Sequence, residues 1–165
     1  MQRKVNQLHA LLEGKIKAEQ YGEAPFELYE PIRYLMSLGG KRLRPILALL
    51  GYHLFREDVE SIIEQAVAIE VFHNFTLMHD DIMDEAPIRR GKPTVHEKWN
   101  TNTAILSGDV MLVKAYDLLL DTPKKKLKPL IRIFNKCAAE VCEGQQFDML
   151  FETKETVEET EYINM

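Results

Sequence analysis

A long apolar stretch, residues 58–84, decides which folds are open to this chain. Its apolar side chains follow helical spacing and occupy most faces of the helix that they predict: Ile62, Ile63, Ala66, Val67, Ile69, Val71, Phe72 and Phe75. A helix that is apolar on most faces belongs inside a bundle of other helices. We therefore expect an all-α fold around this helix, with Asp58 as its N-cap and Pro87 beyond its end.

The remaining segments also have helical periodicity, and none alternates in the manner of a strand. Helices are expected over about 2–20, 26–38, 45–55, 102–120 and 123–151. A capping-box pattern, Thr94 with Glu97, predicts a short helix, and Thr156 with Glu159 predicts another. Gly144 interrupts the last long helix at a cost of about 1 kcal/mol relative to alanine, so we expect another group to approach it closely.

Length and charge exclude several classes of protein. The chain has 165 residues, enough for one domain that buries roughly 70% of its unfolded surface. A net charge of −5 argues against nonspecific binding to nucleic acid. No apolar run approaches the roughly 20 residues of a membrane span, and the start has no signal-peptide core. Cys137 and Cys142 lie about 140° apart on a predicted helix, so we expect reduced, buried thiols in a cytoplasmic protein.

Three carboxylates close the apolar stretch: Asp80, Asp81 and Asp84. On a helix Asp80 and Asp84 lie about 40° apart, one turn from each other, and repel unless a cation lies between them. Carboxylates without nearby His or Cys suit Mg²⁺, which fills its shell with water and substrate phosphates. Arg89 and Arg90 follow and suit the anionic end of such a substrate. The alternative is a solvated acidic face, but the apolar flanks make unpaired acids costly there. The pattern indicates a diphosphate site.

Other polar residues can belong to the same site. His73 lies about 20° from Asp80 on the helix and can face a ligand, or it can be a hydrogen-bonded core residue. Residues 39–45 place three cations beside a glycine pair at the start of a helix, which favours anion binding; the alternative is a solvated basic turn. Gln145 and Asp148 share a helix face and can equally be surface residues.

The sequence has no persuasive nucleophile set, Walker loop or zinc spacing. A carboxylate-bound metal with basic residues and no nucleophile suits a reaction in which diphosphate simply leaves. Metal and cations would stabilise the departing charge, and apolar walls would keep water from the carbocation.

Five ordered motifs resemble those of the trans-polyprenyl diphosphate synthases. They are GGKRLRP at 39–45, His73 with LMHDDIMD at 77–84, RRGKPTVH at 89–96, LSGD at 106–109 and GQQFDM at 144–149. The resemblance implies the N-terminal part of the isoprenoid synthase helical bundle, in a homodimer. It also implies an Mg²⁺-dependent head-to-tail condensation of an allylic diphosphate with isopentenyl diphosphate.

The resemblance also implies a role for each matching residue. Asp80 and Asp84 would bind Mg²⁺ with Asp81 in support, and Arg89 would contact the allylic diphosphate. A basic set would hold isopentenyl diphosphate: Lys41, Arg44, His73 and Arg90. Two residues farther along would complete the site: Gln145 as a substrate contact and Asp148 near the metal.

Product length is expected to depend on the residues four and five positions before the first aspartate, which form the floor of the cavity in this family. Here they are Thr76 and Phe75. Thr76 lies about 40° from Asp80, which supports a pocket-lining role, whereas Phe75 lies about 140° away and its role rests on the resemblance alone. One aromatic with a small neighbour favours a twenty-carbon product, geranylgeranyl diphosphate, with the fifteen-carbon farnesyl diphosphate as the alternative.

One departure from the family is large. The second aspartate-rich motif and the Lys-Thr pair of its C-terminal half have no counterpart in this sequence. We therefore expect residues 1–165 to be the N-terminal half of a single all-α domain, inactive alone. Two alternatives stay open: a noncatalytic companion subunit of a prenyl synthase, or a helical interaction module with a structural cation site.

Overall fold

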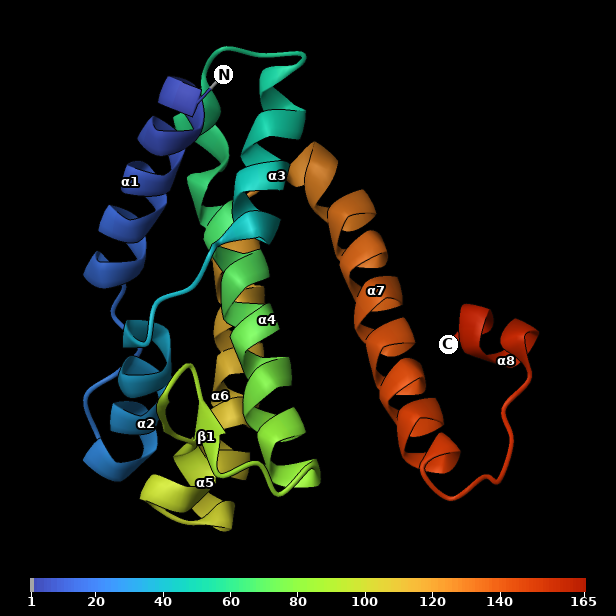
Figure 1. Cartoon of the computed structure of the whole chain (residues 1–165). Helices are drawn as coiled ribbons and strands as arrows, with labels where there is room; N and C mark the ends of the chain where they lie inside the picture. Colours follow the sequence, from blue (N-terminus) through green and yellow to red (C-terminus); the bar gives the residue numbers. More distant parts are fainter. Residues whose placement is uncertain (1) are drawn as a thin grey trace. The chain divides into compact units, whose positions relative to one another are not determined.

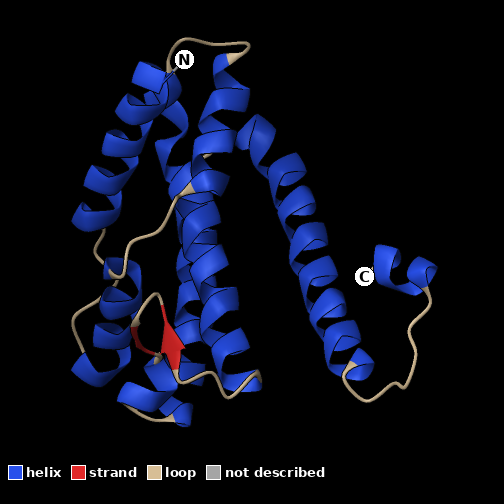
Figure 2. Ribbon diagram, viewed as in Figure 1, coloured by secondary structure: helices blue, strands red, loops and turns tan. Residues whose placement is uncertain are grey.

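A computed structural model describes residues 2–165, most of them in helices (Figure 1 and Figure 2). The chain forms two compact units, one up to Thr122 and one from Pro123 onward. The first contains α1 (Gln2–Ala18), α2 (Phe26–Ser37), α3 (Leu43–His53), the 3₁₀ turn η1 (Val59–Ile62), α4 (Ile63–Met83), β1 (Ile88–Arg89), β2 (Lys92–Pro93), α5 (Val95–Lys98) and α6 (Thr101–Leu119). The second contains α7 (Lys124–Phe151) and α8 (Glu159–Asn164).

The apolar segment forms the central helix of the first unit, as predicted. α4 packs most extensively against α6 and also contacts α1, α2 and α3. The consecutive residues Ala66, Val67 and Ala68 are all fully buried. Three successive positions on a helix point in three directions, so α4 is enclosed by neighbours on most faces.

The predicted start of this helix is wrong. Asp58 precedes a 3₁₀ turn, η1, and its side chain makes no capping bond. Its carboxylate instead accepts hydrogen bonds from the hydroxyl of Tyr52 and from Nε of Arg56, both at 3.3 Å. The side chain is therefore engaged with the end of α3 and the loop after it.

Both predicted capping boxes also need correction. Thr94 does precede α5, but its side chain makes no cap bond and donates to the carbonyl of Ala86 at 2.7 Å. The capping box of α8 is formed by Glu158 and Glu161 rather than by Thr156 and Glu159. Thr94 fails to cap because its hydroxyl has another partner, and the capping box of α8 lies two residues later than predicted.

A two-stranded antiparallel hairpin, absent from the prediction, follows α4. β1 pairs with β2 so that Ile88 faces Pro93 and Arg89 faces Lys92. Arg90 and Gly91 form the turn, with φ of 54° and 75°. Two left-handed residues in a two-residue loop suit the right-handed twist of a hairpin. This hairpin carries the two arginines of the expected site.

The second unit corrects the expectation for the thiols. Cys137 and Cys142 both lie on α7 and are exposed, not buried. The expectation for Gly144 is confirmed, because a Cβ there would lie 3.2 Å from the carbonyl oxygen of Met165. Among the described helices of both units, none is long and apolar enough to cross a membrane.

Candidate functional site

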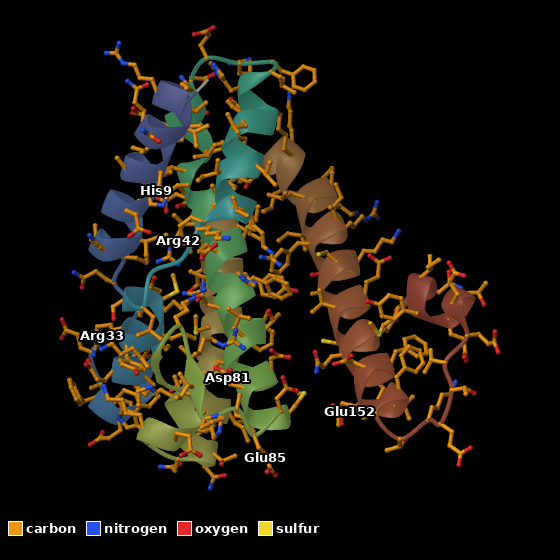
Figure 3. The ribbon with its side chains drawn as sticks, in the orientation of Figure 1. His9, Arg33, Arg42, Asp81, Glu85 and Glu152 are labelled. Atoms are coloured by element: carbon orange, nitrogen blue, oxygen red, sulfur yellow. The ribbon has the colours of Figure 1, made fainter. Side chains whose placement is uncertain are left out.

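Three aspartates lie at the C-terminal end of α4 and its C-cap, and Arg89 forms ion pairs with the first two, Asp80 and Asp81. Asp81 is labelled in Figure 3. Nε of Arg89 donates to both carboxylate oxygens of Asp81, at 2.8 and 2.9 Å. Nη2 donates to Asp80 at 3.2 Å. Asp81 is buried, and burial raises the pKa of its carboxyl, while the hydrogen bond and charge of Arg89 act in the opposite direction. Asp81 is thus the carboxylate that orients Arg89.

Asp80 and Asp84 are the more accessible carboxylates. Asp84 is exposed and forms the C-cap of α4, and the Asp80 side chain keeps 31% of its surface. No three His, Cys, Asp or Glu side chains of residues 2–165 converge into a preformed metal cluster. Two carboxylates one turn apart nevertheless match the protein ligands that Mg²⁺ takes when phosphate and water supply the others. This donor set fits the metal that the sequence predicts.

The two arginines of the hairpin point to different places. Arg89 turns toward the aspartates, whereas Nη1 of Arg90 donates to the carbonyl of Gly39. A Cβ on Gly40 would lie 3.2 Å from the Arg90 guanidinium. Burial and the nearby Arg42 lower the pKa of Arg90, but a guanidinium stays charged at neutral pH. Arg89 ends β1, and Arg90 and Gly91 form the tight turn that follows. The side chains of the two consecutive arginines therefore leave the hairpin in different directions.

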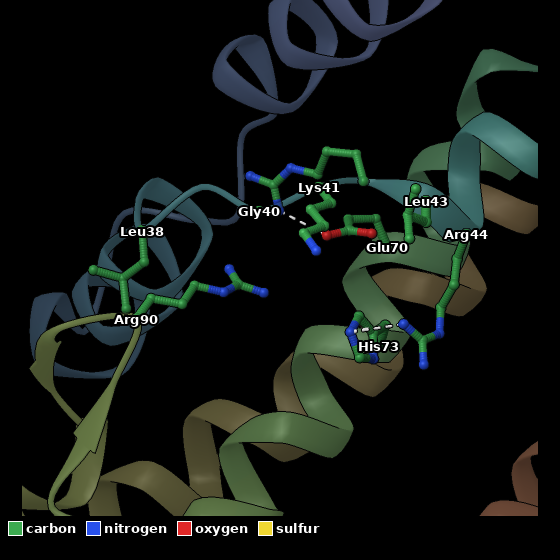
Figure 4. Close-up of a pocket in the computed structure, with 9 residues that line it drawn as sticks. Leu38, Gly40, Lys41, Leu43, Arg44, Glu70, His73 and Arg90 are labelled. Atoms are coloured by element: carbon green, nitrogen blue, oxygen red, sulfur yellow. Dashed lines mark hydrogen bonds and ion pairs between the residues drawn. The ribbon is translucent and has the colours of Figure 1, made fainter. Parts of the chain in front are cut away.

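Arg90 reaches a cavity of about 530 Å³, which we call the basic pocket. Figure 4 shows Arg90 approaching from the hairpin, Lys41 from the loop between α2 and α3, and His73 from α4. The lining residues are Leu38, Gly40, Lys41, Arg42, Leu43, Arg44, Glu70, His73 and Arg90. The four residues predicted for isopentenyl diphosphate therefore line one cavity, while the aspartates are not part of its lining.

His73 is neutral in this pocket. Its Nε2 lies 3.1 Å from Nη1 of Arg44, and since a guanidinium only donates, this nitrogen accepts and the proton is on Nδ1. Burial lowers the pKa of His73, and the positive charge of Arg44 lowers it further. The helix stripe predicts that His73 lies with Asp80, but the side-chain partner of His73 is Arg44, in the first turn of α3.

Arg42 departs from the expected row of three ligand-facing cations. Its guanidinium is buried and donates to Glu13 at 2.8 Å, to Glu70 at 2.7 Å and to the carbonyl of Met36 at 3.0 Å. Sequence reasoning missed Glu70, although an acid inside a helix that is buried on most faces needs a partner. That requirement is the signal that could have linked it to the cations at 41–44.

The residues expected to limit product length, Phe75 and Thr76, are half-buried on α4. The Thr76 hydroxyl donates to the carbonyl of His73 at 2.7 Å. The ring of Phe75 packs edge-on against His79, with centroids 4.8 Å apart. His79 in turn lies over Gly108 of α6, where a Cβ would collide with its ring. Phe75 is thus part of a layer that backs onto α6.

Gln145 and Asp148 lie on α7, in the second unit, and are not among the side chains that the first unit brings together. Asp148 is exposed. The Gln145 amide nitrogen is buried and has no hydrogen-bond partner among the described residues.

Comparison with known proteins identifies the class to which this helical bundle belongs. A model of the polyprenyl synthetase family matches residues 25–165. The geranylgeranyl diphosphate synthase of Methanosarcina mazei is 46% identical over 143 residues, which cover 86% of this chain and 44% of that protein. The geranylgeranyl pyrophosphate synthase of Geoglobus acetivorans is 41% identical over 157 residues, covering 94% of this chain and 49% of that one.

A solved structure agrees with these relatives. The geranylgeranyl pyrophosphate synthetase of Pyrococcus horikoshii superposes with a TM-score of 0.92 at 40% identity, over 99% of this chain and 50% of that one. This chain belongs to the polyprenyl synthetase family. It spans about half the length of the relatives that it matches.

Proposed function

We propose that this chain contributes two diphosphate sites to an Mg²⁺-dependent prenyltransferase, which condenses an allylic diphosphate with isopentenyl diphosphate. The observation that carries the proposal is the divergence of Arg89 and Arg90 from one turn. One arginine joins an acidic group suited to a metal, and the other joins a pocket of cations. Two adjacent anion sites of different character suit two diphosphate substrates with different fates.

The acidic end of α4 would hold the allylic diphosphate, the substrate that loses its diphosphate. Asp80 and Asp84 would bind Mg²⁺, which when bound neutralises the departing charge. Arg89, held by Asp81, would donate to the phosphate oxygens from a fixed orientation. The C–O bond of the allylic substrate breaks with its electron pair leaving on diphosphate.

The basic pocket would hold isopentenyl diphosphate, whose diphosphate stays attached. Lys41, Arg44 and Arg90 supply positive charge without a metal, and the Nδ1–H of His73 can donate to a phosphate oxygen. Fixing this substrate beside the ionised one lets its double bond attack the allylic carbon, after which a proton is lost. Positioning of this kind supplies much of the rate of a two-substrate reaction.

A short-chain product, geranylgeranyl diphosphate, is favoured, with farnesyl diphosphate as the alternative. The three relatives described above are named for geranylgeranyl synthesis. Phe75, with the small Thr76 beside it, leaves one aromatic side chain at the proposed floor.

The proposal includes a homodimer, as the family resemblance implies, in the cytoplasm. Exposed apolar side chains at seven-residue spacing along α6 and its C-cap support it: Leu106, Val113 and Leu120. A stripe of this kind suits packing against another helix. We further propose that residues 1–165 do not condense the substrates alone, since the sequence holds one aspartate-rich motif. A noncatalytic companion subunit would have little reason to keep Asp80, Asp84 and both arginines.

Calorimetric titration with inorganic pyrophosphate separates a synthase from a helical interaction module. A synthase should bind pyrophosphate, and adding Mg²⁺ should increase the amount bound. Asp80→Ala with Asp84→Ala should remove the Mg²⁺-dependent part and leave the rest. A chain that ignores pyrophosphate in both conditions would be an interaction module with a structural cation.

A further inference from the structure

A buried charge cluster lies directly behind the basic pocket. Arg42 is bonded to Glu13, to Glu70 and to the carbonyl of Met36, and we call these four residues the Arg42 clamp. The side chains of Arg42 and Glu70 are 1% and 3% exposed, whereas Glu13 keeps 24%. Asn74 adds a hydrogen bond to the Glu70 carboxylate at 3.1 Å. The clamp ties α1, α2 and α4 to the loop that precedes α3.

The backbone at Arg42 is unusual for a residue with a side chain. Its φ and ψ are 49° and 35°, in the left-handed region, which a Cβ disfavours. Gly39 and Gly40 before it also have positive φ, 74° and 154°. A loop held in this way persists only when its surroundings fix it, and the buried guanidinium of Arg42 provides three bonds that do so.

Lys41 and Arg44 lie on either side of this fixed residue. Lys41 immediately precedes Arg42, and Arg44 lies two residues after Arg42, in the first turn of α3. Both line the basic pocket with Glu70 itself. The direction of both cations therefore depends on the backbone at Arg42, and the acid that holds Arg42 lies three residues before His73 on α4.

We propose that Arg42 and Glu70 are positioning residues, which hold Lys41 and Arg44 in the geometry that binds a diphosphate. This inference rests on the proposed function of the basic pocket. The Arg42 side chain is only 1% exposed, and each of its three guanidinium nitrogens donates a hydrogen bond within the clamp, so it acts through the loop rather than on the ligand. Glu70 acts through Arg42, although it is a negative charge in the wall of an anion site.

The direction in which Glu70→Gln changes the affinity for an anion distinguishes three explanations. Coulomb's law alone predicts that Glu70→Gln tightens the binding of an anion, because a negative charge leaves the pocket wall. A salt bridge that only stabilises the fold predicts lower thermal stability with unchanged affinity in the folded chain. The clamp predicts weaker binding, because Arg42 loses one of its two charged partners, the more buried one, and the loop is held less firmly in its conformation.

The experiment is a calorimetric titration of the 165-residue chain with inorganic pyrophosphate without Mg²⁺, below the melting temperature of each variant. Arg42→Lys keeps the charge but cannot form the three-way set of bonds, so affinity should fall about tenfold or more. Glu70→Gln should lower it by a smaller factor. The matched control is Arg33→Lys, because Arg33 bonds Glu30 and the carbonyl of Gly22 away from this pocket. Its affinity should be unchanged.

Combining variants distinguishes a positioning role from a loss of stability, because it measures whether their effects on pyrophosphate affinity add. When Lys41 and Arg44 are both changed to Ala, adding Arg42→Lys should have little further effect on pyrophosphate affinity, because the groups it positions are gone. Full additivity would contradict the proposal.

The outcomes distinguish a failure of the proposed anion site from a failure of the positioning role of Arg42 and Glu70. If the unmodified chain binds no pyrophosphate without Mg²⁺, the anion-site proposal fails and this inference fails with it. If the unmodified chain binds it and Glu70→Gln binds as tightly or more tightly, the positioning role alone is overturned. Should Arg42→Lys not fold, the sign of the Glu70→Gln change still decides between the three explanations.

Discussion

Among the three aspartates of the motif, Asp81 bonds most fully to another side chain of the protein, that of Arg89. It is buried and accepts two hydrogen bonds from Arg89, while Asp84, three residues later at the end of α4, is exposed. We predict that Asp81→Asn lowers the free energy of unfolding by about 1–3 kcal/mol, the range for losing a buried bond to a charged partner. Urea denaturation measures this value. Asp84→Asn is the matched control and should change it by less than about 0.5 kcal/mol.

His73 should make diphosphate binding depend on pH. Burial and Arg44 lower its pKa in the free pocket, and a bound diphosphate would raise it again by adding negative charge. Binding then takes up a proton, so affinity should rise as pH falls from about 8 toward 6. Titrations of the native chain and of His73→Gln across this range isolate the effect, because protonation of the ligand is common to both. Parallel profiles would contradict it.

The same shift has a consequence for folding. His73 has a lower pKa in the folded chain than in the unfolded chain, where it is about 6.5. The unfolded state therefore binds the proton more readily, and stability falls as pH drops through about 6.5 toward the folded value. His73→Gln should lose this part of the acid sensitivity, as thermal melting at a series of pH values would show.

At the scale of elements, the hairpin β1–β2 positions both arginines. Gly91 has a φ of 75° in its turn, and the Tyr34 hydroxyl anchors the second strand through the Pro93 carbonyl at 2.8 Å. We predict that Gly91→Ala lowers stability by about 1–2 kcal/mol, since an L side chain disfavours this conformation, and weakens pyrophosphate binding with and without Mg²⁺. Gly14→Ala in α1 is the control: nothing lies near its Cβ position, so stability should hold or rise by up to about 1 kcal/mol.

The contact between α4 and α6 depends on a glycine. A Cβ at Gly108 would collide with the ring of His79, whose Nε2 lies 3.2 Å from the carbonyl oxygen of Ile105. Gly108→Ala should therefore cost about 1–3 kcal/mol by overpacking. Adding His79→Ala should recover part of the loss, and chemical denaturation of the three variants measures this coupling. Strict additivity would mean that the strain lies elsewhere.

Local sequence patterns predicted the long helices well, but not the hairpin, the helix caps or the exposure of the two cysteines. The central helix was predictable because apolar residues recur on most of its faces along its 21 residues, and α4 is indeed enclosed on most faces. The hairpin was not, because strands of two residues each have no alternation to detect. The capping boxes failed where a side chain found another partner, as Thr94 did with the Ala86 carbonyl. Cys137 and Cys142 were misjudged because residue type alone does not fix burial.

For the molecule as a whole, the candidate site was predictable where it depends on motifs in sequence order. Lys41, Arg44, His73 and Arg90 were grouped from the family resemblance, and they line one cavity. The partners of Arg42 were not predictable in this way, because Glu13 and Glu70 lie 29 and 28 residues from it in the sequence. Pairings at that separation leave no local periodicity, and only the cost of a buried charge points to them.

The central claim is that one turn divides two diphosphate sites, and ligand titration of Arg89→Ala and Arg90→Ala tests it most directly. Each variant is titrated with isopentenyl diphosphate and with an allylic diphosphate, with and without Mg²⁺. We predict that Arg90→Ala weakens isopentenyl diphosphate about tenfold or more, the loss for a charged hydrogen bond, and spares the allylic ligand. Arg89→Ala should weaken Mg²⁺-dependent binding of the allylic ligand and spare the other. If both variants weaken the same ligand alone, the two arginines serve one site and the account is wrong.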